Sequence, residues 1–130
     1  MKCLDTDFLV AILRGRDDAK RKMTDLDGEG RHGTTAVNAF ELFYGAHKST
    51  QRVANIDKTR SLLGRLDVLP LEQDASEAAG EILADLTAQG VSIDFRDAMI
   101  AGIAKTNGLA LVTRNRGHFS RVKNLKLESW

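Results

Sequence analysis

The sequence predicts a single α/β domain in which helices cover both faces of a parallel β-sheet. Helical patterns alternate with short apolar runs along the whole chain, which is the order typical of such sheets. The clearest helical pattern, Glu72–Gln89, has a broad apolar face and stops at Gly90. The run Leu109–Val112 is apolar throughout, as expected for a strand that is buried on both faces. No repeat or linker interrupts the order, so we expect one domain over residues 1–130.

The other elements follow from the spacing of apolar residues and from residues that stop a helix. We expect strands at Leu4, Thr34–Val37, Val68–Leu69, Leu109–Val112 and within Leu125–Glu128, and helices over 8–13, 17–26, 51–66, 72–89 and 96–106. A further helix begins at Asn38, which we interpret as its N-cap, with Glu41 at the capping-box position.

Composition limits the class of protein. A chain of 130 residues with 42% hydrophobic and 28% charged residues suits one globular domain, and a net charge of +1 neither requires nor excludes nucleic acid. The only cysteine, Cys3, excludes an internal disulfide and suits packing in a reducing compartment. The segment Met1–Leu13 contains Asp5 and Asp7 and is a poor signal peptide, and no later window approaches the roughly 20 apolar residues of a membrane span. We therefore expect a cytoplasmic protein.

Four acidic or amide positions lie in separate, recognisable settings: Asp5, Glu41, Asp97 and Asn115. Asp5 follows the first predicted strand and Asn115 the penultimate one, and ligands of open parallel sheets collect beyond the carboxyl ends of the strands. Three carboxylates gathered in one pocket suggest a hard cation, because oxygen ligands suit Mg²⁺ or Mn²⁺. Too few His and Cys residues are placed to hold a softer metal. The pattern points to metal-dependent hydrolysis of a phosphodiester.

The segments around these positions resemble the PIN-domain ribonucleases and, within them, the VapC-type toxins of prokaryotic toxin–antitoxin pairs. The resemblance runs nearly end to end and is carried by Leu-Asp-Thr-Asp, Asn-Ala-Phe-Glu-Leu-Phe-Tyr-Gly-Ala, Arg-Asp-Ala-Met-Ile-Ala-Gly and Leu-Val-Thr-Arg-Asn-Arg-Gly-His-Phe. It implies a PIN-like fold with strand order 3-2-1-4-5 and a Mg²⁺- or Mn²⁺-dependent endoribonuclease. It also implies a homodimer and a small partner antitoxin that blocks the site.

The resemblance also assigns roles to residues. Asp5, Glu41 and Asp97 match the first three acidic positions of the family, and Asn115 stands where many members have a fourth Asp. An amide oxygen can coordinate a metal or bond a metal-bound water but adds no charge, so a second ion would be held less firmly. Other members carry Thr-Arg-Asn here, so Asn115 does not indicate inactivation. Thr6 and Thr113 sit beside the acids, where their hydroxyls can orient waters.

The expected mechanism follows from the charge. A cation held by the carboxylates acts as a Lewis acid and lowers the pKa of a bound water, which attacks phosphorus in line, and a second ion can stabilise the leaving oxygen. Asp97 or Asp5 can accept the proton of the attacking water, and the sequence leaves that choice open.

Several acids have a structural alternative. Asp5 or Asp7 can cap the helix that follows, and Glu41 can serve only the capping box. Asp94 and Asp97 have the spacing of an N-cap and the third helical residue, so we take Asp94 as a cap first and an auxiliary metal ligand second. Asp7 is expected to be structural or to support the ligands from behind.

Other side chains have weaker indications. His118 follows the acidic loop and can touch a phosphate, but a lone histidine near a loop is usually a surface residue. A basic tail can follow an RNA backbone or be a solvated face: Arg114, Arg116, Arg121, Lys123 and Lys126. Phe40, Phe43 and Tyr44 are expected to be mostly core, with any exposed part contributing to a dimer face.

Three other functions compete with a toxin ribonuclease. RNA processing outside a toxin role shares the chemistry and differs in context. A non-catalytic module whose acids bind a metal or a partner is favoured only by Asn115. A receiver-like signalling domain ranks last. Its phospho-acceptor Asp should follow a central strand and a Lys should follow the last strand, whereas here the acids are spread along the whole chain and Lys126 lies within a predicted strand.

Overall fold

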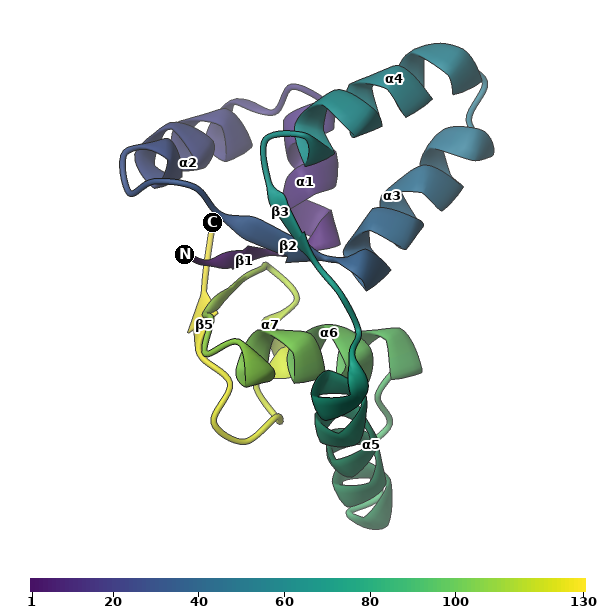
Figure 1. Cartoon of the computed structure of the whole chain (residues 1–130), viewed down its shortest axis with the longest axis vertical. Helices are drawn as coiled ribbons and strands as arrows, with labels where there is room; N and C mark the ends of the chain where they lie inside the picture. The colour runs from purple at the N-terminus through teal and green to yellow at the C-terminus, as the bar shows by residue number, and fades with distance from the viewer.

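The computed structural model describes all 130 residues, built around a five-stranded parallel sheet with helices on both faces (Figure 1). The strand order is β3-β2-β1-β4-β5, and every neighbouring pair is parallel. The strands are short: β1 (Cys3–Leu4), β2 (Gly33–Thr35), β3 (Asp67–Leu69), β4 (Leu111–Val112) and β5 (Leu127–Glu128). This architecture and order confirm the predicted fold class.

Seven helices connect the strands. They are α1 (Thr6–Leu13), α2 (Asp17–Asp27), α3 (Ala36–His47), α4 (Arg52–Leu63), α5 (Gln73–Ala88), α6 (Phe95–Thr106) and α7 (Arg116–Phe119). In Figure 1, α1 to α4 lie above the sheet, and α5, α6 and α7 lie below it. None of these helices is long and apolar enough to cross a membrane.

The core is divided between the two faces of the sheet because successive strand residues point in opposite directions. In β1, Cys3 packs into the cluster built mainly by α5 and α6, while Leu4 packs into the cluster built by α1, α2 and α4. In β4, Leu111 and Val112 divide in the same way. All four side chains are fully buried, which explains why both strands are apolar without alternation.

The start of α3 differs from the prediction. The helix begins at Ala36, and its N-cap is Thr35, which has extended backbone angles. The Thr35 hydroxyl accepts from the Asn38 amide, and the Asn38 side chain accepts from the Thr35 amide, so Asn38 is the third helical residue of the capping box. The prediction of Asn38 as N-cap was wrong, as was the capping-box role offered for Glu41. Because Thr35 ends β2 and caps α3 at once, the strand stops two residues before Val37.

Smaller differences concern the ends of elements. Helix α4 ends at Leu63 because Gly64 caps it, three residues before the predicted end. Strand β4 covers only the second half of the predicted Leu109–Val112 run. The short helix α7 was not predicted, since four residues that include Gly117 carry no helical pattern.

Candidate functional site

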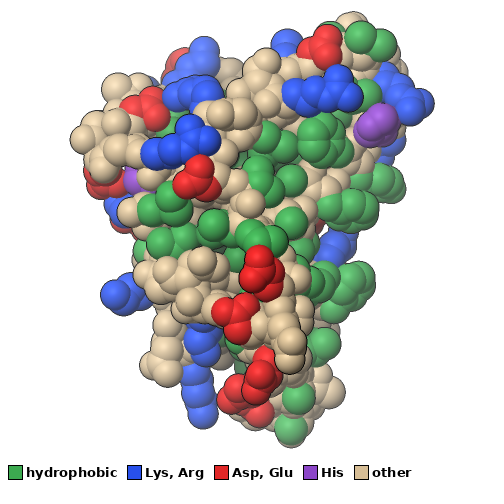
Figure 2. Space-filling model, viewed as in Figure 1, with side chains coloured by type: hydrophobic (Ala, Val, Ile, Leu, Met, Phe, Trp, Pro, Cys, Tyr) green, Lys and Arg blue, Asp and Glu red, His purple; other side chains and the backbone are tan.

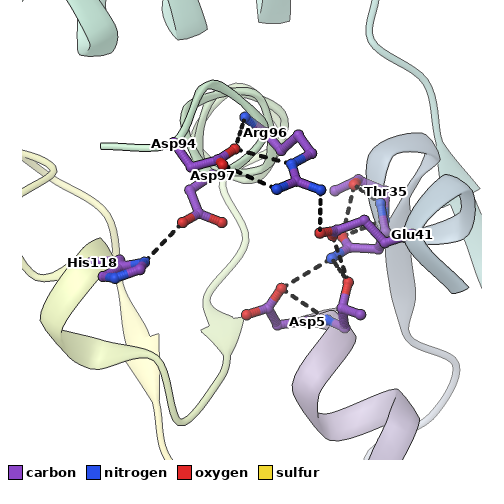
Figure 3. Close-up of polar contacts among 9 residues, drawn as sticks. Asp5, Thr35, Glu41, Asp94, Arg96, Asp97 and His118 are labelled. Carbon is purple, nitrogen blue, oxygen red and sulfur yellow. Dashed lines mark hydrogen bonds and ion pairs between the residues drawn. The ribbon is translucent and has the colours of Figure 1, made fainter. Parts of the chain in front are cut away.

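The predicted site residues come from four different segments that meet at the carboxyl edge of the sheet (Figure 3). Asp5 directly follows β1, Thr35 ends β2, and Thr113 directly follows β4. Because these three strands are adjacent and parallel, their carboxyl ends face the same edge. The N-terminal turns of α1, α3 and α6 border the space above that edge.

Asp5 lies at the centre of the arrangement. It is the N-cap of α1 and its Oδ1 accepts from the Thr6 amide at 2.8 Å and from Asn38 Nδ2 at 3.0 Å. Its Oδ2 accepts from the Thr113 hydroxyl at 2.7 Å. Only 5% of the residue is exposed, and this burial, opposed by the hydrogen bonds and reinforced by the charge of Asp7, raises the pKa of Asp5 to about 6. The capping role suggested for Asp5 is therefore confirmed, and the same side chain faces the pocket.

Glu41 is linked to Asp5 by a chain of hydrogen bonds. Asn38 Nδ2 donates to the Thr6 hydroxyl at 2.8 Å, and that hydroxyl donates to Glu41 Oε1 at 2.8 Å. Asn38 thus bonds Asp5 and Thr6 with one amide group. Burial raises the pKa of Glu41 above its ordinary value, against the opposing effect of the Thr6 bond and of Arg96. Burial is the main cause of the raised pKa of both carboxylates, and acids with perturbed pKa values gather at functional sites.

Asp97 lies on the far side of the pocket, in the first turn of α6. Its Oδ2 is 3.0 Å from His118 Nδ1, and Asn115 Nδ2 is also 3.0 Å from that nitrogen. The Nδ1 atom cannot bond both partners at once. Without a hydrogen it accepts from the Asn115 amide, and with a hydrogen it donates to the Asp97 carboxylate. Asn115 therefore reaches Asp97 only through His118.

Asp94 is the N-cap of α6, as predicted from its spacing, and accepts from the Arg96 amide at 2.8 Å. The Arg96 guanidinium pairs with the same carboxylate through Nε at 3.1 Å and Nη2 at 3.0 Å. These bonds hold the pKa of Asp94 below its usual range. The remaining Nη1 of Arg96 points across the pocket to Glu41 Oε2, 4.0 Å away, as Figure 3 shows.

The loop after β4 is held by Asp7 and Trp130. Asp7 Oδ2 accepts from the Arg114 amide at 2.8 Å, and Asp7 Oδ1 accepts from the indole nitrogen of Trp130 at 3.3 Å. The Arg114 guanidinium stacks on the Trp130 ring and pairs with Asp18 at 2.8 Å. Asp7 thus supports the loop that carries Thr113 and Asn115, and its Oδ2 lies 3.3 Å from the Thr113 hydroxyl that also bonds Asp5.

The sequence matches the PIN-domain family over residues 2–125. The chain belongs to the PIN-domain family. A curated relative in Shigella flexneri, named tRNA(fMet)-specific endonuclease VapC, is 34% identical over 98% of this chain and 96% of its own length.

Solved PIN-domain structures superpose on nearly the whole chain. A VapBC complex of Rickettsia felis bound to a promoter DNA fragment has a TM-score of 0.91 at 29% identity and covers 99% of this chain and 98% of its own. A DNA-bound VapBC complex of Salmonella typhimurium has a TM-score of 0.90 at 30% identity, with coverage of 100% and 99%. The resemblance to VapC-type PIN proteins is thereby confirmed, as is the predicted class of enzyme, a nuclease of this family.

PIN-domain nucleases of the VapC type generally depend on a divalent metal, and the chemistry of this pocket suits one. Every acidic side chain of the pocket offers hard oxygen atoms, and the two more buried ones have raised pKa values that a nearby cation would lower. Yet no three of the His, Cys, Asp or Glu residues converge as a ready-made ligand group. The carboxylates instead face protein donors: Asp5 faces Thr113, Glu41 faces Thr6 and Arg96, and Asp97 faces His118.

The structure thus brings most predicted site residues of this PIN domain together. Asp5, Glu41, Asp94 and Asp97 border one pocket, and Thr6 and Thr113 bond two of these acids directly. Asn115 is separated from the nearest of these acids, Asp97, by the His118 ring. Sequence reasoning missed the positions of Asn38 and Arg96. The spacing of Thr35 and Asn38 could have indicated the capping box, whereas nothing in the sequence shows where the Arg96 side chain turns.

Two weaker predictions are corrected by the structure. Phe40 and Tyr44 are not core residues, since 58% and 56% of their surfaces are exposed and their rings stack on each other. The basic tail is not one continuous face: Arg114 is engaged by Asp18 and Trp130, while Arg121 and Lys123 line a separate hollow beside α5.

Proposed function

We propose that this chain is a VapC-type toxin, a cytoplasmic endoribonuclease that hydrolyses RNA phosphodiester bonds with Mg²⁺ or Mn²⁺. The observation that carries the proposal is the gathering of Asp5, Glu41 and Asp97 at the carboxyl edge of the sheet. Three distant segments contribute these acids, and each comes from a motif on which the PIN resemblance rests. A structural role for all three acids would not require that they share one pocket.

In this proposal, Asp5, Glu41 and Asp97 hold the cation, and Asp94 is an auxiliary ligand at the rim. A divalent ion bound there supplies Lewis-acid activation of the phosphodiester and of the attacking water. Asn115 completes the pocket on the side of His118 without adding charge.

The chain's own neutral side chains orient the acids. Thr113 and Asn38 fix the two oxygens of Asp5, and Thr6 fixes one oxygen of Glu41. Each acid therefore keeps a defined orientation before any ligand arrives, which lowers the cost of organising the site. Thr35 and Asn38 also fix the start of α3, and with it the position of Glu41 one turn later.

The relatives suggest the substrate and the partner. Because the Shigella flexneri relative is named for tRNA(fMet), we propose a structured RNA of the transfer RNA class as substrate. The VapBC complexes suggest a small cognate antitoxin that covers the pocket. We also propose a homodimer, to which the exposed stacked pair Phe40 and Tyr44 on α3 contributes.

The test compares the wild-type protein, purified free of any partner, with Asp5→Asn and Asp97→Asn. Asp57→Asn, an exposed acid on α4, is the matched control. Initiator transfer RNA is incubated with Mg²⁺, with Mn²⁺ or with chelator, and an elongator transfer RNA is run in parallel. We expect metal-dependent cleavage that falls by at least about 100-fold in both pocket variants and is unchanged in the control.

Two outcomes would contradict the proposal. Equal cleavage by the pocket variants and the wild type would mean that the chemistry lies elsewhere or in a contaminating nuclease. Cation binding without cleavage of any RNA would favour the non-catalytic module that Asn115 alone supports.

A further inference from the structure

Arg96 lies in the first turn of α6, which borders the acid pocket, and its guanidinium extends toward Glu41. It is the second residue of α6, and its side chain folds back over the helix start to pair with Asp94 through two nitrogens, at 3.0 and 3.1 Å. Such a two-point pair fixes the plane of the guanidinium. The third nitrogen is thereby aimed at Glu41 on α3, 4.0 Å away.

This position bridges separate elements of the site. Figure 3 shows the guanidinium between the start of α6 and Glu41, on the same side of the pocket as Asp97. Arg96 interacts electrostatically with Asp94, Glu41 and Asp97, and all three interactions favour its charged form.

A guanidinium and a divalent cation cannot both occupy this place. The guanidinium has five donors and no lone pair, so it competes for the carboxylate oxygens and offers none itself. Two positive charges within a few ångströms of each other also repel. Arg96 and His118 together engage Glu41, Asp94 and Asp97, so each of these three acids already has a protein partner.

We propose that Arg96 is a built-in counter-ion that stabilises the acid pocket in the cation-free protein and competes with the divalent cation for Glu41 and its neighbours. Binding of the cation then displaces the guanidinium from Glu41. The arginine therefore lowers the affinity of the pocket for the divalent cation. This inference rests on the proposed cation-dependent function, and its test measures cation binding without RNA.

The first experiment measures Mn²⁺ affinity by calorimetry for the wild type, Arg96→Gln, Arg96→Lys and Arg31→Gln. Arg31 is the matched control, because it is an exposed arginine paired through Nε with a carboxylate, Asp67, at the opposite edge of the sheet. We expect Arg96→Gln to bind roughly two- to tenfold more tightly, Arg96→Lys, which keeps the charge but loses the two-point pair, to lie between it and the wild type, and the control to be unchanged.

Unchanged or weaker binding by Arg96→Gln would overturn the proposal, as would failure of both wild type and variant to bind the ion. Binding by the variant alone would support it strongly. Thermal unfolding of each protein shows whether the variants are folded.

A second measurement follows Arg96 in the wild-type protein. We expect its Nε–H resonance, assigned by its absence in Arg96→Gln, to shift when Mg²⁺ is added, while that of Arg31 stays in place. A stationary Arg96 resonance at saturating Mg²⁺ would contradict displacement. Because neither measurement uses RNA, a protein that binds the ion but fails to cleave RNA would overturn the proposed function and leave this inference standing.

Discussion

A single residue, Asp5, serves both the fold and the proposed chemistry, and the two roles oppose each other. As an N-cap it stabilises α1, and as a buried acid it is ionised at neutral pH only at a cost. The pKa of Asp5 is raised from its ordinary value of 3.8 to about 6 mainly by burial. Between these two pH values the cation-free folded protein therefore holds a proton at Asp5 that the unfolded chain has already released.

The sign of the pH effect follows from that difference. Between pH 3.8 and about 6 the folded protein binds more protons at Asp5 than the unfolded chain does, so its stability falls as the pH rises through this window. Above this pH window the loss in the free energy of unfolding is complete, and it amounts to at most about 3 kcal/mol.

We predict that Asp5→Asn stabilises the cation-free protein by about 1–2 kcal/mol at pH 7.5 and by nothing near pH 4. The amide removes the buried charge and its oxygen can still accept from Thr6 and Asn38. Urea unfolding in chelator at both pH values measures the difference, and Asp57→Asn should shift stability by less than about 0.5 kcal/mol at either. A variant that is less stable than the wild type at pH 7.5 would show that capping by the charged form outweighs its burial.

At this scale the sequence identified acids but could not show their neighbours. Asp5, Glu41 and Asp97 were selected because their residue type and their motifs both predict a cation site, and the structure shows that they border one pocket. Asn38 was assigned to the wrong helical position because Thr35 and Asn38 are both good caps, and only the backbone of the folded chain shows which one is extended. The reach of Arg96 depends on how α3 packs near α6, which no local pattern reports.

Helices α5 and α6 share the most extensive contact between two elements in the molecule, and this contact depends on a glycine. A methyl group at Gly102 of α6 would lie 2.8 Å from the Ala75 carbonyl oxygen and 2.9 Å from Ala79 Cβ on α5. Real Cβ atoms do not approach so closely, so the helices would have to separate. Since α6 carries Asp94 and Asp97, a shift of this helix would also move the pocket.

Glycine to alanine substitutions should therefore have opposite effects on the two helices. We predict that Gly102→Ala destabilises the protein by about 1–3 kcal/mol through overpacking. Gly80→Ala, on the exposed side of α5 with open space around it, should stabilise by about 0.5–1 kcal/mol through higher helix propensity. Chemical unfolding of both variants measures the contrast, and a stabilised Gly102→Ala protein would contradict the contact.

Most elements could be predicted from the sequence because their apolar spacing is regular. The helix over Gln73–Ala88 and its partner over Phe95–Thr106 begin and end within one residue of the prediction. The ends of short strands were harder to predict from the sequence. The two residues of β4 differ from the apolar residues before them only in that they pair with β1 and β5. The helix α7 is ordered by tertiary contact, with Phe119 fully buried in the core.

Over the whole molecule, α5 is the most negatively charged helix and α4 the most positively charged one. Helix α5 contains four acidic residues and no basic one, whereas α4 contains three basic residues and one acid: Asp74, Glu77, Glu81 and Asp85 against Arg52, Lys58, Arg60 and Asp57. Figure 2 shows basic side chains gathered over α2 and α4 and acidic ones along α5. A polyanion approaching this face would be drawn toward α4 and away from α5.

A groove beside the acid pocket extends this positive side toward Glu41. It has a volume of about 280 Å³ between α1, α3 and α4, and its lining includes Glu41 together with Arg14, Lys48 and Lys58. The three basic side chains are exposed at its edge. An RNA strand that crosses the pocket can place its phosphates along them, which the dispersed basic tail does not allow.

We predict that replacing Arg14, Lys48 and Lys58 together by alanine weakens RNA binding. The slope of the logarithm of the binding constant against the logarithm of the salt concentration should become shallower by the equivalent of up to about three phosphate contacts. The comparison is made in chelator on an Asp5→Asn background, so that no RNA is cut, by fluorescence anisotropy over a range of NaCl concentrations. The control replaces Arg121, Lys123 and Lys126 by alanine. These substitutions remove the same charge from the basic tail, which the sequence alone had suggested as a path for the RNA backbone. If net charge were the cause, both triple variants would lose affinity equally. If the tail were the RNA path, the control would lose more, and a loss confined to the groove variant would place the RNA between α3 and α4, where it leads directly to Glu41.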